Sequence, residues 1–446
     1  MILFSDFISQ VCAEITHNKN ETNDIYQYAV ILPPSLQAAL PVTDWPGWLN
    51  GQVCYPQFYW QHRDGTETAA VCGELCRFTH ISEAQAVLDT LPEQSNIRIW
   101  GLNSWQFDTL SSATPEQGTG GSYLFIPRAE LRCVQGNIQF LVNIDSRRPV
   151  QETVNFLRSL RGDVIPPVLE TTVISAEHQP DKAGWMQLVR GAVTAISGGL
   201  MEKVVTARKT VLRLSSPVRP LAFMQASRDC NHHCYHYMLA IAPDNAFMAS
   251  PPERLYLRTG AQLCTEALAG TVAGYPDDAR AEAAARWLLA DKKNVHENSV
   301  VVDDICQRLS GAVNTLKVSD ATVIRLRKVQ HLYRTISATL YAPRDSDCLQ
   351  RLQPTAAVAG LPRTAALEFL RKNEPFERNW YAGSGGWCSP SQSEFAVSLR
   401  CAQIHGSQID LYAGAGIVAG SDPQAEWNEI ENKAAGLRTL LEGEPH

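Results

Sequence analysis

Near its end, the chain carries three charged side chains whose spacing could build a site on one face of a helix. Glu426, Glu429 and Lys433 follow each other at intervals of three and four residues, which a helix brings together. Asp422 can act as the N-cap of that helix, and Pro423 suits its first position. Carboxylate oxygens are the ligands that a hard cation such as Mg²⁺ prefers. The segment therefore predicts a helix face that could hold such a cation.

A glycine-rich segment directly before this helix favours the same interpretation. Residues 414–420 read Gly-Ala-Gly-Ile-Val-Ala-Gly, which brings bare backbone close to whatever the acidic face holds. Carboxylates beside such backbone and a helix start suggest a cation that meets an anionic ligand. The plainer alternative is an exposed helix with a Glu429–Lys433 ion pair, which contributes only about a few tenths of a kcal/mol.

A third acid lies on a helix that we predict over residues 294–309. Glu297 shares a face with apolar residues of that helix, and a carboxylate there is costly to bury without a partner. A glutamate at the edge of the buried surface fits the same spacing. Together with Glu426 and Glu429, Glu297 could complete a Mg²⁺ site that leaves coordination positions for water and a substrate.

Two further side chains could move protons. Lys203 opens a predicted strand and alternates with the apolar Val205 and Ala207. It is either a lysine that reaches out from a strand end or a buried base with a lowered pKa. Glu253 follows two prolines that stiffen its approach, although a plain acid at a strand edge fits as well.

Composition limits the class of protein. The 446 residues are 45% hydrophobic, which suffices for a large core, and a net charge of −7 gives no overall attraction to nucleic acid or an anionic membrane. The N-terminus lacks the basic start of a signal peptide, and no apolar run approaches the roughly 18 residues that span a bilayer. We therefore expect reduced cysteines, a cytoplasmic protein, and no nucleic-acid or membrane partner. The cluster 230–236 contains metal-ligand types, but zinc sites draw ligands from separated segments, so a helix end followed by a strand is the better interpretation.

The pattern of the chain changes near residue 178. We expect residues 1–177 to form a sheet-rich part of a sandwich and residues 178–446 to form a catalytic region, together in one structural unit. Hairpins are expected over 122–144 and 235–257, helices over 185–196, 281–289 and 294–309, and strands within 323–340, 380–387, 394–402 and 408–413. Hairpins interrupted by long helices favour an α+β fold with large antiparallel sheets over a doubly wound parallel sheet.

Taken together, these segments resemble the chorismate-utilising enzymes, and most closely the isochorismate synthases of menaquinone biosynthesis. The resemblance rests on ordered runs at 203–208, 252–255, 266–271, 296–297, 329–332, 354–362, 381–383 and 414–433. Runs at 55–61 and 98–103 are similar to the menaquinone branch in particular. The resemblance implies two large antiparallel β-sheets that pack face to face, with helices on the outside.

The resemblance also implies a role for each candidate residue. Lys203 matches the general base that activates water, and Glu253 matches the general acid. Glu297 and Glu429 match the carboxylates that hold Mg²⁺, with Glu426 alongside. The other matches are to positions that hold the substrate, chorismate: Gly270, Thr271, His331, Ala357, Val358, Tyr381, Arg400, Gly414, Gly416 and Lys433. The implied reaction is the Mg²⁺-dependent isomerisation of chorismate to isochorismate, by attack of water at C2 and loss of the C4 hydroxyl.

The same residues bear on several alternative functions. Family members that make anthranilate usually carry threonine where Ala357 stands, and aminodeoxychorismate-type members can carry a nucleophilic lysine there, so both activities are disfavoured. Salicylate-forming relatives share the lysine at position 203, which makes pyruvate elimination the closest competitor. An isochorismate synthase of siderophore synthesis and an acidic scaffold without catalysis are further alternatives. We expect a monomer or a weak homodimer.

Overall fold

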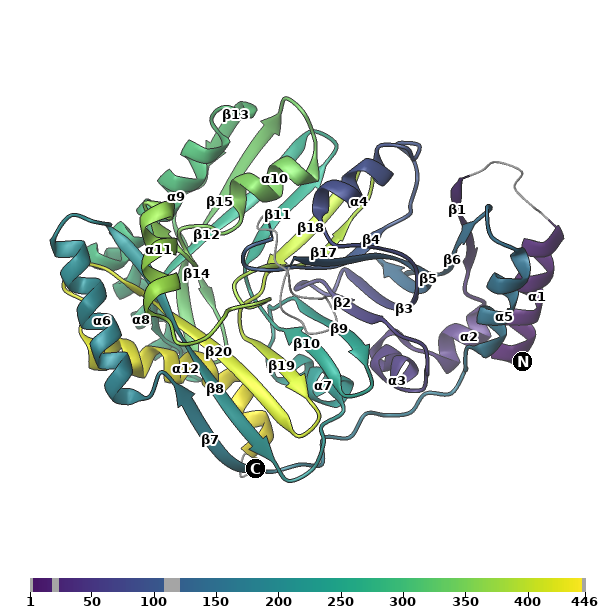
Figure 1. Cartoon of the computed structure of the whole chain (residues 1–446), viewed down its shortest axis with the longest axis horizontal. Coiled ribbons are helices and arrows are strands. Elements are labelled where there is room, and N and C mark those ends of the chain that lie inside the picture. Colours follow the sequence, from purple (N-terminus) through teal and green to yellow (C-terminus); the bar gives the residue numbers. More distant parts are fainter. Residues whose placement is uncertain (1–2, 18–23, 108–120, 443–446) are drawn as a thin grey trace.

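Antiparallel strands and covering helices make up the part of the chain that the structure describes. The computed structural model describes residues 3–17, 24–107 and 121–442 (Figure 1). Every strand pairing within these residues is antiparallel. The prediction of an α+β fold with large antiparallel sheets is therefore confirmed.

One long strand, β5 (Ser122–Val134), belongs to two sheets at once. Its first residues pair with β4 (Ile99–Asn103), and most of its length pairs with β3 (Glu67–Phe78). A register shift in the β3–β5 pairing, between Glu74 and Cys76, accompanies this change of partner. The twenty strands thus form one hydrogen-bonded network that folds into two layers.

The two layers mix strands from both ends of the chain. The larger sheet runs, by pairing, through β1 (Ile25–Ile31), β6 (Asn137–Asp145), β5, β3, β2 (Gln57–Gln61), β9 (His236–Ala242), β10 (Asn245–Ala249), β19 (Cys401–His405), β20 (Gln408–Ile417) and β8 (Lys203–Leu214), with β7 (Val173–Gln179) and β16 (Gly360–Leu361) on β8. The smaller sheet runs through β4, β17 (Ser384–Cys388), β18 (Gln392–Val397), β11 (Arg254–Thr259), β12 (Gln262–Ala273) and β15 (Val329–Leu340), with β13 (Val313–Val318) and β14 (Thr322–Arg325) on β15.

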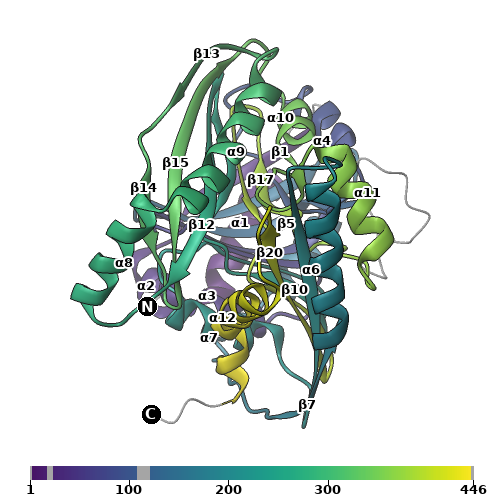
Figure 2. The ribbon, with the colours of Figure 1, turned by 90° about the vertical axis from the view of Figure 1, so that its left-hand side faces the viewer.

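Helices cover the outer faces of both sheets. They are α1 (Phe4–His17), α2 (Pro34–Ala39), the 3-10 helix η1 (Val42–Asp44), α3 (Trp45–Asn50), α4 (Ile81–Leu88), α5 (Val150–Ser159), α6 (Lys182–Ser197), α7 (Pro220–Cys230), α8 (Asp278–Ala290), α9 (Lys292–Leu309), α10 (Asp345–Leu352), α11 (Arg363–Asn373) and α12 (Pro423–Glu442). In Figure 2, α6, α11 and α12 lie over β8 and β20, while α8 and α9 lie against β12 and β15. The predicted N-cap of α12 is confirmed, because Asp422 Oδ1 accepts a hydrogen bond from Ala425 N at 2.8 Å.

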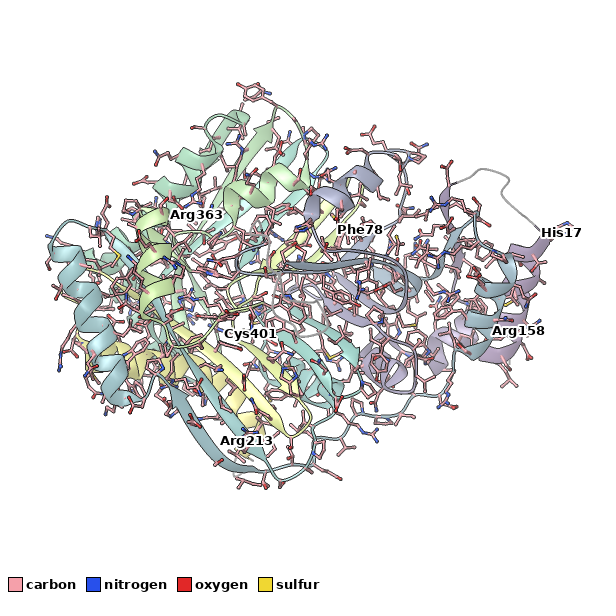
Figure 3. All side chains as sticks on the ribbon, in the orientation of Figure 1. His17, Phe78, Arg158, Arg213, Arg363 and Cys401 are labelled. Carbon is pink, nitrogen blue, oxygen red and sulfur yellow. The ribbon has the colours of Figure 1, made fainter. Side chains whose placement is uncertain are left out.

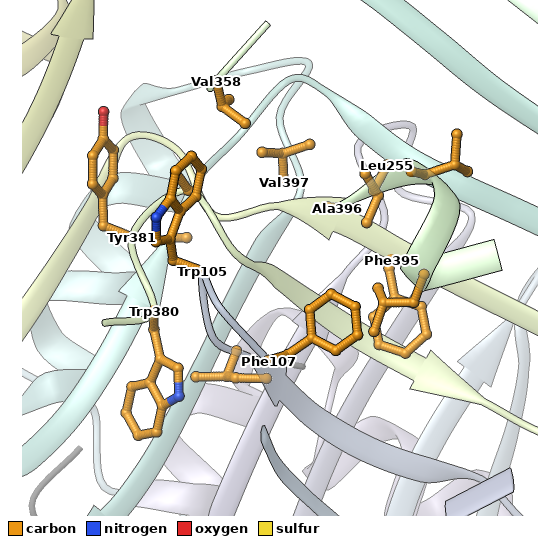
Figure 4. Close-up of a cluster of buried hydrophobic side chains, with 14 of the residues drawn as sticks. Trp105, Phe107, Leu255, Val358, Trp380, Tyr381, Phe395, Ala396 and Val397 are labelled. Carbon is orange, nitrogen blue, oxygen red and sulfur yellow. The ribbon is translucent and has the colours of Figure 1, made fainter. Parts of the chain in front are cut away.

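Aromatic and aliphatic side chains pack in the interior, and Figure 4 shows part of this buried cluster. Phe58 of the larger sheet and Trp100 of the smaller sheet have ring centroids 5.6 Å apart, and Trp100 also meets Trp387 at 6.1 Å. Tyr381 and Val358, which Figure 4 labels, belong to the same buried cluster. This rigid interior supports the residues of the candidate site from behind.

The cysteines play no part in a disulfide framework. All twelve are free thiols, and Cys401, labelled in Figure 3, is completely buried. Within the cluster 230–236, α7 ends at Cys230 and β9 begins at His236, as predicted. None of the helices in the described residues is long and apolar enough to cross a membrane.

Two predicted strands are shorter than expected. The strand expected to run to residue 257 ends at Ala249, and the strand expected over 394–402 stops at Val397. The prolines at 251 and 252 have no N–H to donate to a ladder, and Arg400 has a φ of 49°, which a strand does not accept. At both interruptions the chain crosses from one sheet to the other, since β10 and β19 lie in the larger sheet and β11 and β18 in the smaller one.

Candidate active site

A pocket lies where the two crossing connections meet. Ser250 N donates to Arg400 O at 3.1 Å, and Val397 N donates to Glu253 O at 3.1 Å, so the connections are hydrogen-bonded side by side. All ten residues that the sequence suggested for holding a substrate line this pocket, together with Glu253 and Glu297. Lys203, Glu426 and Glu429 lie around it rather than in its lining.

Lys203 occupies the first position of β8 and is only 1% exposed. Its Nζ donates to Glu297 Oε1 of α9 at 3.0 Å. Gly416 of β20 makes room for this pair, because a Cβ there would lie 2.7 Å from Glu297 Oε1 and 3.0 Å from Lys203 Cε. The amine of Lys203 is thus held beside a carboxylate of the pocket lining.

Glu253 presents a protonated carboxyl to the pocket. Its side chain is buried, and Oε1 has no hydrogen-bond partner among the described residues. Burial, and after it the negative charge of Glu266, raise the pKa of Glu253 to about 8, although the charges of Lys203, Lys433 and Arg63 oppose the rise. A carboxylic acid with this pKa holds its proton at neutral pH and can give it to a leaving group.

Arg400 offers an unneutralised guanidinium group to a ligand. Its Nη2 lies 3.2 Å from His331 Nε2, and we find no carboxylate paired with it in the described residues. Since arginine only donates, Nε2 accepts and Nδ1 carries the hydrogen towards Thr271 Oγ1, 3.0 Å away. Burial, and then the charges of Arg400 and Lys433, hold the pKa of His331 well below its usual range, so the imidazole is neutral. A carboxylate is the natural partner for this arginine.

The predicted acidic face of α12 points towards the same region. Lys433 Nζ lies 2.7 Å from Glu429 Oε1 and donates to Gly414 O at 3.0 Å. Glu426 is buried, 3.7 Å from Lys293 Nζ, and burial followed by the charge of Glu429 raises its pKa. The α12 carboxylates therefore repel each other at short range.

Carboxylate oxygens are the kind of ligand that a hard cation prefers, but these carboxylates are not clustered as the ligands of a metal ion would be. Across residues 3–17, 24–107 and 121–442, no three histidine, cysteine or acidic side chains stand close enough together to hold a metal ion. Glu297 and Glu429 instead pair with Lys203 and Lys433. An all-oxygen donor set suits Mg²⁺, and a divalent cation would relieve the repulsion between Glu426 and Glu429.

Small residues and buried polar contacts shape the pocket walls. A Cβ on Gly414 would lie 2.6 Å from Tyr381 Oη, so this glycine lets the phenol approach β20. The loop that carries Val358 is held by Arg378, which donates to Val358 O at 2.9 Å and to Val205 O at 2.6 Å. Arg378 therefore ties one wall of the pocket to the strand that begins with Lys203.

Sequence reasoning missed several residues that line or support the pocket. The missed lining residues are Val205, Pro252, Leu268, Ala269, Leu399, Tyr412 and Ala413, nearly all apolar. They adjoin residues that were singled out, and their proximity to those motifs is the signal that could have found them. Glu266 is a buried charge whose partner Arg63 lies far away in sequence, whereas Arg378 pairs with Glu374 at a spacing of four, a local signal that sequence reasoning did not use.

Comparisons with known proteins find similar chains over most of the sequence. The family model described as "Chorismate binding enzyme" matches residues 35–442. The chain is 50% identical to isochorismate synthase MenF of Escherichia coli strain K12 over 401 residues, which is 89% of this chain and 90% of the relative. It is 38% identical to isochorismate synthase MenF of Pasteurella multocida over 89% of this chain and 90% of the relative.

Solved structures agree as well. The structure of MenF, the menaquinone-specific isochorismate synthase from Escherichia coli, superimposes with a TM-score of 0.89 at 45% identity and covers 97% of this chain and 98% of that one. Anthranilate synthase component I from Streptococcus pneumoniae gives a TM-score of 0.68 at 19% identity, over 86% of this chain and 91% of that one, and shares the fold.

Proposed function

This chain belongs to the chorismate-binding enzymes, and from that premise we propose that it isomerises chorismate to isochorismate with Mg²⁺, for menaquinone biosynthesis. One observation carries the proposal: the buried carboxyl of Glu253 lines the pocket, and the buried amine of Lys203 lies beside that pocket, 3.0 Å from Glu297 Oε1 of its lining. High identity to isochorismate synthases over nearly the whole chain supports the same reaction.

Substrate binding follows from the charges at the pocket. Chorismate carries two carboxylates, one on its ring and one on its enolpyruvyl group. Arg400 would bind the enolpyruvyl carboxylate through charge-assisted hydrogen bonds, and the backbone at Gly414 and Gly416 would lie against the ring. Glu297 and Glu429, with Glu426 alongside, would hold Mg²⁺, and the bound ion would neutralise the ring carboxylate.

The chemistry needs one base and one acid. Lys203, as the neutral amine, takes a proton from the water that attacks C2. The double bonds shift across the ring, and Glu253 gives its proton to the C4 hydroxyl, which leaves as water. One water molecule enters and one leaves, so substrate and product are isomers. Acid and base each typically contribute about 10²–10⁴ in rate.

Product analysis tests the proposal. Purified protein is incubated with chorismate and Mg²⁺, and the products are separated by liquid chromatography. Isochorismate alone supports the proposal. Salicylate with pyruvate would favour a lyase of the salicylate-synthase type, and no conversion would favour a non-catalytic binding protein. A matched incubation without Mg²⁺ but with EDTA measures the metal requirement.

The proposal extends to the setting of the enzyme. We place the reaction in the cytoplasm and expect a monomer or a weak homodimer, which analytical ultracentrifugation over a range of concentrations measures. Menaquinone rather than siderophore synthesis is favoured because the similar Escherichia coli protein is described as menaquinone-specific. Complementation of a menaquinone-deficient strain, but not of a siderophore-deficient one, would support this assignment.

A further inference from the structure

A set of buried charges lies directly behind Glu253, outside the pocket lining. Arg63 belongs to the connection between β2 and β3, and its Nη1 donates to Pro252 O at 2.8 Å and to Glu266 Oε2 at 2.8 Å. Its Nη2 also pairs with Glu266 Oε1. Glu266, completely buried on β12, accepts further hydrogen bonds from Arg254 N at 3.1 Å and from Tyr333 Oη at 3.0 Å.

From this arrangement we infer that Arg63 and Glu266 are a positioning pair for the proposed isomerisation: Arg63 holds the backbone beside Glu253 in place, and the negative charge of Glu266 keeps the Glu253 carboxyl protonated. The inference rests on the proposed function for the role of Glu253. Neither Arg63 nor Glu266 lines the pocket, so both act through Glu253 rather than on the substrate.

Backbone hydrogen bonds on both sides of Glu253 hold this residue in position. Arg63 holds the carbonyl of Pro252, the residue directly before it, while Val397 N holds the carbonyl of Glu253 itself at 3.1 Å. The Glu253 Oε1 atom has no partner of its own within the described residues. Its direction into the pocket therefore depends on the backbone that these bonds fix.

The charges that face Glu253 influence whether its carboxyl stays protonated. Glu266 on β12 disfavours a second negative charge nearby, whereas Arg63, Lys203 on β8 and Lys433 on α12 favour one. The pocket also contains the neutral imidazole of His331, the cation of Arg400 and the carboxylate of Glu297. Burial and Glu266 prevail, and the pKa of Glu253 lies well above its ordinary value.

This balance predicts opposite effects from the two members of the pair. Glu266→Gln removes the repelling charge and leaves Arg63 without its carboxylate partner, so Glu253 ionises at lower pH. Arg63→Met removes a positive charge that favours ionisation of Glu253. It also leaves the negative charge of Glu266 without this partner, so Glu253 ionises at higher pH. Damage to the fold alone would lower activity in both variants without moving the ionisation in opposite directions.

The test is the pH dependence of kcat/KM with chorismate and Mg²⁺. In the wild type, the alkaline fall should centre near the pKa of Glu253, about 8. We expect it to move down by about one pH unit in Glu266→Gln and up by a similar amount in Arg63→Met, the size of shift that a nearby buried charge causes. Arg63→Lys keeps the charge, so the fall should stay where it is while kcat decreases through loss of the paired hydrogen bonds.

A matched control is the Arg98–Glu67 pair, in which Arg98 is buried and Glu67 is partly exposed; Arg98 Nη1 and Glu67 Oε1 are 2.7 Å apart, and neither residue is among the charges that act on Glu253. Arg98→Met should lower the melting temperature and leave the pH dependence of kcat/KM unchanged. Shifts of the same sign in Glu266→Gln and Arg63→Met, or no shift in either, would overturn the inference.

A second readout separates this inference from the proposed function. Glu253→Gln is introduced into the wild type, Glu266→Gln and Arg63→Met, and urea unfolding measures the pH at which its stabilisation of each background stops increasing, which is set by the pKa of Glu253 in the folded protein. This pH should also move in opposite directions in the two variants, even if the wild type fails to convert chorismate. Equal pH values in the three backgrounds would refute the inference independently of turnover.

Discussion

Replacing Glu253 by glutamine should stabilise the protein at neutral pH while it abolishes the proposed acid. Burial and the charge of Glu266 raise the pKa of Glu253 from 4.5 to about 8. The stability that this group contributes is therefore fully present below pH 4.5 and is lost as the pH rises towards 8. Between these pH values Glu253 releases its proton in the unfolded chain, which lowers the free energy of the unfolded state, whereas the folded protein keeps the proton.

The magnitude follows from the same pKa. Between pH 4.5 and 7, each pH unit lowers the free energy of unfolding by about 1.36 kcal/mol, which amounts to a loss on the order of 3 kcal/mol at pH 7. Glutamine does not ionise, so the Glu253→Gln protein escapes this loss. For a chain of 446 residues, such a gain corresponds to a rise of roughly 3 °C in the melting temperature.

The assay is urea unfolding of the wild type and Glu253→Gln, followed by tryptophan fluorescence at a series of pH values from 4.5 to 8. The buried amide brings a constant offset, so the readout is the change in the stability difference with pH. Glu93→Gln, at an exposed glutamate, serves as the control and should show no comparable pH dependence. A stability difference that stays constant from pH 4.5 to 8 would refute the reasoning, because it would mean that Glu253 ionises alike in the folded and unfolded chain.

Three further substitutions test other parts of the site. Lys203→Ala should fold and bind Mg²⁺ but lose about 10²–10⁴ in kcat, and near-normal turnover would rule out Lys203 as the base. Glu429→Gln should raise the Mg²⁺ concentration needed for half-maximal activity, whereas an unchanged magnesium titration would remove this residue from the metal site. Gly416→Ala should fold but lose turnover, because its Cβ would stand 2.7 Å from Glu297 Oε1; a normal kcat would show that the Lys203–Glu297 pair tolerates the crowding.

Local patterns in the sequence predicted the elements that carry the site. The helix with Glu426, Glu429 and Lys433 follows from a cap and from spacing, and both depend only on neighbouring residues. The strand that begins with Lys203 follows from alternation in the same way. Family resemblance, rather than spacing, joined these elements into one pocket.

Contacts between segments that lie far apart in the chain could not be predicted from local sequence patterns. The interruptions that carry Glu253 and Arg400 were expected to be continuous strand, because the crossing from one sheet to the other depends on which strands pair. The pairing of Lys203 with Glu297 joins residues 94 positions apart, and that of Arg63 with Glu266 joins residues 203 positions apart. No periodicity encodes such pairs, which form only when the two sheets pack.

The nature of the nucleophile is the most direct test of the central claim. The wild-type protein is incubated with chorismate and Mg²⁺ in water enriched in ¹⁸O, and the isochorismate formed is analysed by mass spectrometry. Because Lys203 is proposed to activate water for attack at C2 while the C4 hydroxyl leaves, the product should carry one ¹⁸O atom, located on C2. Isochorismate without the label would contradict the account, since its C2 oxygen would then have come from chorismate itself.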